Sequence, residues 1–579
     1  MKDKSANVDV SVQDETPQAS LAVPARSSFQ SACIVLTCTS AMILNIANSS
    51  AVSISLPIIG RELHIVEYKL QWLVSAYALS SGCLLMFLGR IADLYGRKRI
   101  FLIGTIVLGA FGLGCGFAQS SSTLYGCPHS IGNFLSIPLT DEFTLFILRG
   151  LQGIGGAAVI PASVGILAHS FPPSRARAVA FSTFGAGAPV GAALGTLIGG
   201  VLTQLTKESW KSTFYLLTGL SVVTFVGGVL SIDEDVLDPE RDRRIDWLGA
   251  FLITAGLVLV VFVLGEGSIA PQGWKTPYII TLLIFGVIIV ALFLLWQHYL
   301  EKLESQSEGK LLQSRWTPPP LMRLSVWARA NGRMAVMMFI GFVEWCSFTS
   351  WTFWVQLYYQ EFLMLSPVLT MIRLLPMFVT GVICNAIVAV FVGRVDFVYL
   401  MVIGTALTAV ANLLFAVIKV QATYWAFGFP AAILSVFGAD FVFAAGSLFV
   451  AKVSLPHEQS VGGALLQTMM QLGGAFGLAI TTIIFNSVIT NQSNKEGVPV
   501  DSSGLHAPSH IQEKGYKAAM WGGFAFGILG AIMAAVFMRG VGIVGHRPED
   551  FETEGDIKGK TEGRTSDMEE DCEGHVTAG

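Results

Sequence analysis

Residues 87–104 read FLGRIADLYGRKRIFLIG, which places five charged side chains between two long apolar runs. The charged residues are Arg90, Asp93, Arg97, Lys98 and Arg99. Each flanking run is about twenty residues long, the length that a helix needs to cross the roughly 30 Å hydrocarbon core of a bilayer. The stretch therefore predicts a short polar turn between two membrane-spanning helices.

The same alternation continues along the whole chain. Of its 579 residues, 53% are hydrophobic and only 13% are charged, whereas roughly a quarter of the residues of a soluble protein are charged. Windows of about nineteen residues predict roughly fourteen spans. They lie near residues 32–57, 71–91, 100–118, 143–170, 178–204, 212–231, 247–266, 277–297, 334–355, 367–391, 397–418, 425–450, 461–489 and 518–540. The fold class is an all-α polytopic membrane protein.

Basic residues predict the orientation. With both termini in the cytoplasm, the inner loops hold seventeen Lys and Arg residues and the outer loops nine, as the positive-inside rule expects. The tails, residues 1–31 and 541–579, are polar and are expected to be disordered in the cytoplasm. The sequon Asn491-Gln492-Ser493 falls in the last outer loop, where it is a candidate glycosylation site. We expect the plasma membrane, with the vacuolar membrane as the alternative.

An internal repeat suggests two related halves. FLGRIAD at 87–93 returns in weaker form as FVGRVD at 391–396, each at the inner end of a span. The predicted organisation is two six-helix half-bundles with two additional spans between them. Its parts are 32–231 for the first bundle, 232–297 for the loop and two additional spans, 298–333 for a cytoplasmic linker and 334–540 for the second bundle. Two similar half-bundles with a site between them are a transporter plan, which implies a small-molecule substrate.

The polar turn itself favours a gate. Gly89 and Gly96 permit close packing of helices, and Asp93 lies near the guanidinium groups of its neighbours, where it would form a charge-paired latch. A basic loop that only sets topology is the alternative, and it does not account for the glycines and the acid.

The pattern G-x-x-x-D-x-x-G-R-K-R, from Gly89 to Arg99, resembles the signature loop of the major facilitator superfamily. Three further stretches resemble motifs of its fungal fourteen-span drug:proton antiporters. They are QWLVSAYALS (71–80), RGLQGIGGA (149–157) and GAGAPVGAALGTLIGG (185–200). The resemblance implies proton-coupled antiport by alternating access, with Arg149 in proton relay or conformational coupling. It also implies an exporter bend, formed by Gly187, Pro189, Gly191 and Gly195, and cavity positions at Trp72, Tyr77 and Gln152.

Asn48 departs from this family pattern. The stretch NIANSSAVSISLP (45–57) is similar to a first-helix segment that usually carries a membrane-embedded Asp, and Asn48 occupies that position. An amide carries no proton, so either coupling uses another residue or this member is not a simple proton antiporter.

Two acids within spans are candidates for that role. Hydrocarbon disfavours the charged form of a carboxyl group and raises its pKa, so that the group can bind and release protons near neutral pH. Glu344 lies mid-span, with Phe348 and Trp351 on the same helix face, and an acid beside aromatic rings suits a cationic or amphipathic guest. Asp440 is the second such acid. A structural role in pairing is the alternative for both acids.

Gln467 and Gln471 share a face of the thirteenth span, where they line the cavity or join helices by hydrogen bonds. The loop at 118–142 is either an outer lid or an insert without function, and we favour the insert.

Enzyme functions find no support in the sequence. No G-x-x-x-x-G-K-[ST] phosphate loop is present, and the nine His residues show no metal-ligand spacing. We expect no cofactor, metal or nucleic acid, and a monomer in the lipid bilayer. The sequence therefore predicts an exporter of small amphiphilic organic compounds driven by protons. The alternative is a transporter of one solute (an inorganic acid, siderophore or nutrient), as an exporter or an importer. A sensor on a transporter scaffold is the third hypothesis.

Overall fold

The computed structural model describes most of the chain outside its two ends. The described residues are 27–63, 65, 72–117, 141–172, 174–235, 244–267, 270, 272–306, 317–455, 458–497 and 507–544. Most of the two predicted tails and of the 118–142 loop lie outside these ranges, as do residues 307–316 of the predicted linker, whose first residues belong to a helix that ends at Gln306.

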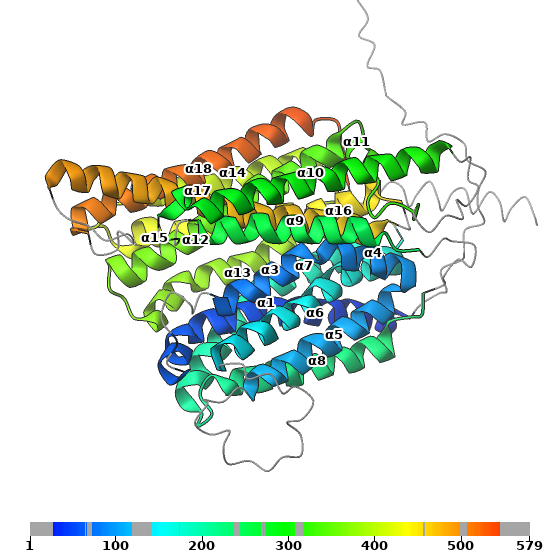
Figure 1. Cartoon of the computed structure of the whole chain (residues 1–579), viewed down its shortest axis with the longest axis horizontal. Coiled ribbons are helices and arrows are strands. Elements are labelled where there is room, and N and C mark those ends of the chain that lie inside the picture. The colour runs from blue at the N-terminus through cyan, green and yellow to red at the C-terminus, as the bar shows by residue number, and fades with distance from the viewer. Residues whose placement is uncertain are drawn as a thin grey trace, which may run out of the picture.

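The described chain is helical, and its long helices run side by side along one direction (Figure 1). Thirteen helices are long and apolar enough to cross a membrane, and a bent pair brings the number up to 14. The prediction of a polytopic helical fold with about fourteen spans is confirmed. Helices are expected here because a backbone in hydrocarbon must satisfy its hydrogen bonds internally.

The described part of the N-terminal half contains seven helices, two of which form one bent span. They are α1 (Ser28–Leu63), α3 (Trp72–Cys83), α4 (Leu85–Tyr95), α5 (Arg97–Gly116), α6 (Asp141–Ser170), α7 (Arg175–Leu205) and α8 (Lys211–Ser231). The bend of 47° between α3 and α4 follows Ser80, whose hydroxyl donates to the carbonyl oxygens of Ala76 and Tyr77. Such back-bonding next to a glycine is a known cause of helix bending.

The C-terminal half is separated from the first by two additional helices. These are α9 (Trp247–Glu266) and α10 (Pro277–Gln306), which form an antiparallel pair. The half itself consists of α12 (Arg333–Leu357), the π-helical turn η4 (Tyr358–Phe362), α13 (Pro367–Phe391), α14 (Phe397–Ala416), α15 (Tyr424–Leu434), α16 (Val436–Val453), α17 (Gln459–Glu496) and α18 (Ser509–Phe537).

Close packing inside the N-terminal half uses a glycine stripe on α7. Gly187, Gly191, Gly195 and Gly199 all face the backbone or side chains of α1, and a Cβ added at Gly191 would lie 2.7 Å from the carbonyl oxygen of Ile43. Helices in membranes approach closely where small residues repeat every four positions. The residues predicted to form an exporter bend therefore lie within an α7 that runs unbroken through Pro189.

The segment before α12 ties the additional helices to the second half. Arg323 pairs with Glu304 at the end of α10 (2.6 Å) and with Glu458 just before α17 (3.5 Å). Arg329 also pairs with Glu458 (2.7 Å). The two halves contact each other through α7 with α13 and through α3 and α4 with α17, and α9 packs against both α3 and α17. The additional pair thus covers one of the two seams between the halves.

Candidate functional site

The polar turn of residues 87–99 joins the two halves. Asp93 is buried, accepts from Arg97 Nε (3.2 Å) and also accepts from the backbone N–H of Val461 at the start of α17 (3.1 Å). Gly89 lies where a Cβ would be 2.9 Å from that of Ala464. Gly96 has φ of 107°, a conformation that favours glycine. We call this end of the molecule the latch end, and these contacts close it.

The other basic residues of the turn lie nearer the surface. The backbone N–H of Lys98 donates to Asp235 (3.0 Å). Arg90 is half-buried, and Arg99 is exposed. A second contact between the halves at this end comes from Arg177, whose guanidinium donates to the carbonyl oxygen of Ala451 (3.1 Å).

Arg149 lies in the middle of the N-terminal half and is fully buried. Its Nε donates to the carbonyl oxygen of Leu73 (2.9 Å), and its two terminal nitrogens donate to Gln152 Oε1 (2.6 Å) and to the carbonyl oxygen of Asn48 (3.3 Å). The guanidinium carbon lies 4.5 Å from the centre of the Tyr77 ring. All of these partners are neutral, and no described acidic residue pairs with Arg149.

Asn48 extends this polar group, which we call the Arg149 cluster: Asn45, Asn48, Tyr77, Arg149 and Gln152. Gln152 Nε2 donates to Asn48 Oδ1 (2.9 Å), and Asn48 Nδ2 donates to the carbonyl oxygen of Leu44 (2.8 Å). The Tyr77 hydroxyl donates to Asn45 Oδ1 (2.6 Å). The sequence-predicted positions 48, 149 and 152 are therefore in one hydrogen-bonded network, and Tyr77 adjoins it through the contact of its ring with Arg149.

Glu344 is the counterpart in the C-terminal half and is fully buried between α12, α14 and α16. Neither carboxyl oxygen has a hydrogen-bond partner among the described residues. The nearby Thr408 hydroxyl is already engaged, because it donates to the carbonyl oxygen of Ser435 (3.0 Å) and accepts from the N–H of Gly438 (3.1 Å). A side chain at Gly438 would overlap the Glu344 carboxyl group.

Asp440 is buried near the contact between α7 and α13 and has a partner. Its Oδ1 accepts from Asn385 Nδ2 (2.9 Å), and its other oxygen lies beside Gly381, which also approaches Pro189. Phe184 stacks on Phe443 across the same seam, with ring centres 6.0 Å apart. Asp440 thus lies where the two halves slide past each other if they rock.

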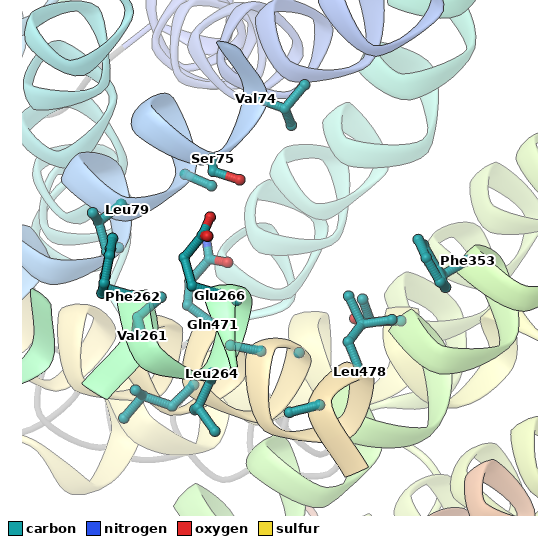
Figure 2. A pocket seen from close by; sticks show the side chains of 18 of the residues that line it. Val74, Ser75, Leu79, Val261, Phe262, Leu264, Glu266, Phe353, Gln471 and Leu478 are labelled. Carbon is teal, nitrogen blue, oxygen red and sulfur yellow. The ribbon is translucent and has the colours of Figure 1, made fainter. Parts of the chain in front are cut away.

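A cavity of about 610 Å³ lies between α3, α9, α12 and α17 (Figure 2). Along α17 it extends from Thr468 to Asn486, beyond the latch contacts at residues 460–464 and toward the opposite end. Its wall is largely apolar, with polar groups at Ser75, Glu266 and Gln471 directed into it. The size suits a drug-sized organic molecule.

The model of a known family matches most of the chain. The family described as Major Facilitator Superfamily matches residues 38–245 and 235–478. The chain belongs to the major facilitator superfamily. Sequence relatives agree with this assignment: a protein named MFS-type transporter 1 from Pyricularia oryzae is 24% identical over 89% of this chain and 85% of its own length.

Other relatives carry more specific names. The puromycin resistance protein of Streptomyces alboniger is 29% identical over 77% of this chain and 80% of its own length. A low affinity ammonium transporter of Saccharomyces cerevisiae is 26% identical over 91% of this chain and 90% of its own. The crystal structure of the human organic anion transporter MFSD10 (TETRAN) shares the fold, with a TM-score of 0.56 and 12% identity over 87% of this chain and 99% of that one.

The remaining sequence-predicted residues of this major facilitator lie in different places. Trp72 and Gln471 line the cavity, whereas Gln467 is half-buried and does not. Phe348 and Trp351 share the inner face of α12 with Glu344, and Trp351 packs against Phe415 (ring centres 5.9 Å apart). Asn491 is exposed near the end of α17, in a sequon whose Ser493 is buried.

The cavity also has a wall that sequence reasoning missed. The face of α12 that lines the cavity carries Trp345, Thr349 and Phe353, and it lies next to the face that carries the predicted Glu344, Phe348 and Trp351. Helix α9 contributes Phe262 and Glu266. The available signal was an acidic residue ending an otherwise apolar span at 247–266. The described residues contain no group of three or more His, Cys, Asp and Glu side chains placed to hold a metal ion.

Proposed function

We propose that this major facilitator exports small amphipathic organic compounds in exchange for protons. The observation that carries the proposal is the cavity between the halves, which has a largely apolar wall and lies beyond a closed latch end. Members of this superfamily transport small molecules, and the relative named for puromycin resistance favours an organic compound. Protons would enter by the outer side of the plasma membrane, with both termini of a monomer in the cytoplasm.

Glu344 is the proposed proton carrier. An ionised carboxylate without partners in a membrane interior is costly, whereas its protonated form is neutral. In the conformation described, Glu344 has no partner to hold a charge. When rocking of the halves opens the helices around Gly438, water would reach the carboxyl group and accept its proton. Asp440 lies beside the contact between the halves, and its hydrogen bond with Asn385 would change when the halves rock.

The driving force is sufficient for useful export. One proton that crosses two pH units and ~100 mV releases about 5 kcal/mol. At one proton per substrate molecule, this corresponds to a gradient of several thousandfold, because each factor of ten costs about 1.4 kcal/mol.

The proposal is tested by accumulation of labelled compounds in cells that express or lack the protein. A panel of lipophilic cations, neutral drugs and organic anions would be measured with and without a protonophore. Lower accumulation on expression, abolished by the protonophore, is the expected result. Equal accumulation of every compound in both cell types would contradict export.

A narrow-specificity transporter is the second candidate function. The relative named as an ammonium transporter and the Asn48 position favour it, because the first helix lacks the acid common in drug antiporters. Expression would then raise the accumulation of one solute, with ammonium and its methylated analogue the first to measure.

A further inference from the structure

We propose that the cavity between α3, α9, α12 and α17 binds an organic cation and that Glu266 of the additional helix α9 recognises its charge. The inference deepens the proposed export function and rests on it for the direction of transport. It gives the additional helix pair a role in selecting the substrate, beyond covering the seam between the two halves.

Glu266 is placed to act on a guest molecule. It is the last residue of α9, is half-buried and lines the cavity. Its carboxylate makes no hydrogen bond or ion pair with any residue that the structure describes. Figure 2 shows it directed into the same space as Ser75 and Gln471, with Phe353 across the cavity. A half-buried carboxylate without a partner attracts a positively charged ligand.

The sign of the local field is negative. Among the described residues that line the cavity, Glu266 is the only one with a charged side chain. The C-terminus of α9 adds the partial negative charge of its helix dipole at the same point. A guest anion would therefore meet repulsion, whereas a cation would neutralise the carboxylate.

Aromatic rings complete the site. Trp72 of α3 lies against Phe262 of α9, with ring centres 5.5 Å apart, so the two elements form one continuous wall. Trp345 and Phe353 of α12 line the cavity as well. Ring faces attract cations and also accept apolar groups. The combination suits a bulky cation whose charge is surrounded by hydrocarbon.

Two probes of the same shape and opposite charge test the proposal: tetraphenylphosphonium and tetraphenylborate. Their binding to the purified full chain would be measured by calorimetry in dodecyl maltoside, a detergent that carries no charge. Glu266→Gln is expected to weaken tetraphenylphosphonium binding about tenfold, a change of about 1.4 kcal/mol, and to leave tetraphenylborate binding equal or tighter.

Charge relocation provides the matched control. In Glu266→Gln/Gln471→Glu the carboxylate moves to another wall of the same cavity, so tetraphenylphosphonium affinity is expected to recover by severalfold. Gln471→Lys in the otherwise unchanged chain is expected to weaken the binding of tetraphenylphosphonium and to strengthen the binding of tetraphenylborate. Unfolding temperatures of the variants in detergent would show that each one is folded.

Two results would overturn the inference: unchanged phosphonium affinity in Glu266→Gln, or an equal loss for both probes. These binding results are independent of transport. If the chain fails to export any compound but Glu266→Gln weakens phosphonium binding and not borate binding, the proposed function fails and the cation site remains. Export of cations together with unchanged phosphonium affinity in Glu266→Gln would leave the function and remove the site.

Discussion

Among the described residues, each half of this transporter has one charged residue with no exposed surface, Arg149 in the first and Glu344 in the second, and the surroundings of the two differ. Arg149 in the N-terminal half donates to three neutral oxygens and lies over the Tyr77 ring. Glu344 in the C-terminal half is equally buried, and neither of its oxygens has a described hydrogen-bond partner. The cation is thus held in a completed network, whereas the polar group beside the acid, the Thr408 hydroxyl, is already engaged with two backbone groups.

This difference suggests a structural role for Arg149 and a role in proton coupling for Glu344. A cation surrounded by fixed acceptors is stable in one state, because moving it would leave several buried oxygens unpaired. A buried acid without hydrogen-bond partners is stable in its neutral, protonated form. It ionises only when a change of conformation brings water or a polar partner to the carboxyl group. We therefore assign proton carrying to the C-terminal half and conformational support to the Arg149 cluster.

The largest expected effect is that of Glu344→Gln. The amide keeps the shape and cannot release a proton, so proton-driven export is expected to fall to the level of cells without the protein. The measurement is protonophore-sensitive efflux as a function of external pH. Asp440→Asn is the matched control, because that acid already has an amide partner, and it is expected to retain a pH-dependent activity. Unchanged pH dependence in Glu344→Gln would remove this residue from the mechanism.

Arg149→Ala is expected to have the next largest effect. It leaves the Leu73 and Asn48 carbonyl oxygens and Gln152 Oε1 without the guanidinium, and buried unpaired polar groups cost about 1–3 kcal/mol each. The free energy of unfolding should fall by about 3 kcal/mol or more, measured as the loss of thermal stability in detergent. Arg149→Lys keeps the charge but reaches fewer acceptors, so its thermal stability should lie between those of the parent protein and Arg149→Ala. A variant as stable as the parent would contradict a supporting role.

Asn48→Asp sharpens the comparison by restoring an acid to the N-terminal half. Its carboxylate would still accept from Gln152 and would lie beside Arg149, whereas the donation from Asn48 Nδ2 to the Leu44 carbonyl oxygen would be lost. We expect Asn48→Asp alone to change efflux less than threefold. Combined with Glu344→Gln it should not restore proton-driven efflux. Recovery in the double variant would show that the first helix still contains a working coupling position.

Gly438→Ala is expected to lower stability less than Arg149→Ala. The added methyl group would overlap the Glu344 carboxyl and approach the Thr408 hydroxyl, and overpacking of this kind costs about 1–3 kcal/mol. Gly530→Ala is the control, since its Cβ would meet Thr405 at an ordinary 3.6 Å. Equal thermal stability of the two variants would mean that the Glu344 pocket has spare room.

Much of this fold is readable from the sequence because hydropathy reports span length directly. The run of apolar residues around 247–266 was predicted to within a residue of α9. The depth of Glu344 within its span followed from counting residues along the helix. Neither observation reports the rotation of a span about its axis. For that reason Trp345, Thr349 and Phe353 were missed as cavity residues.

The site was less predictable where it depends on contacts between distant spans. The 71–80 and 149–157 motifs identified Tyr77, Arg149 and Gln152, yet only the packing of α1, α3 and α6 shows that Gln152 bonds Arg149 and Asn48 and that the Tyr77 ring lies against Arg149. Glu266 ends an additional span that no motif marks, and its place in the cavity follows from the packing of α9 against α3 and α17.

The central claim is that substrate and protons move in opposite directions through one protein. It is tested most directly in proteoliposomes that contain a trapped pH-sensitive dye. The substrate added to them is a compound whose transport the cell panel has shown. Addition of substrate to one side should move protons toward that side, and Glu344→Gln should abolish the proton signal. Substrate transport with no proton movement in the unmodified protein would contradict the account.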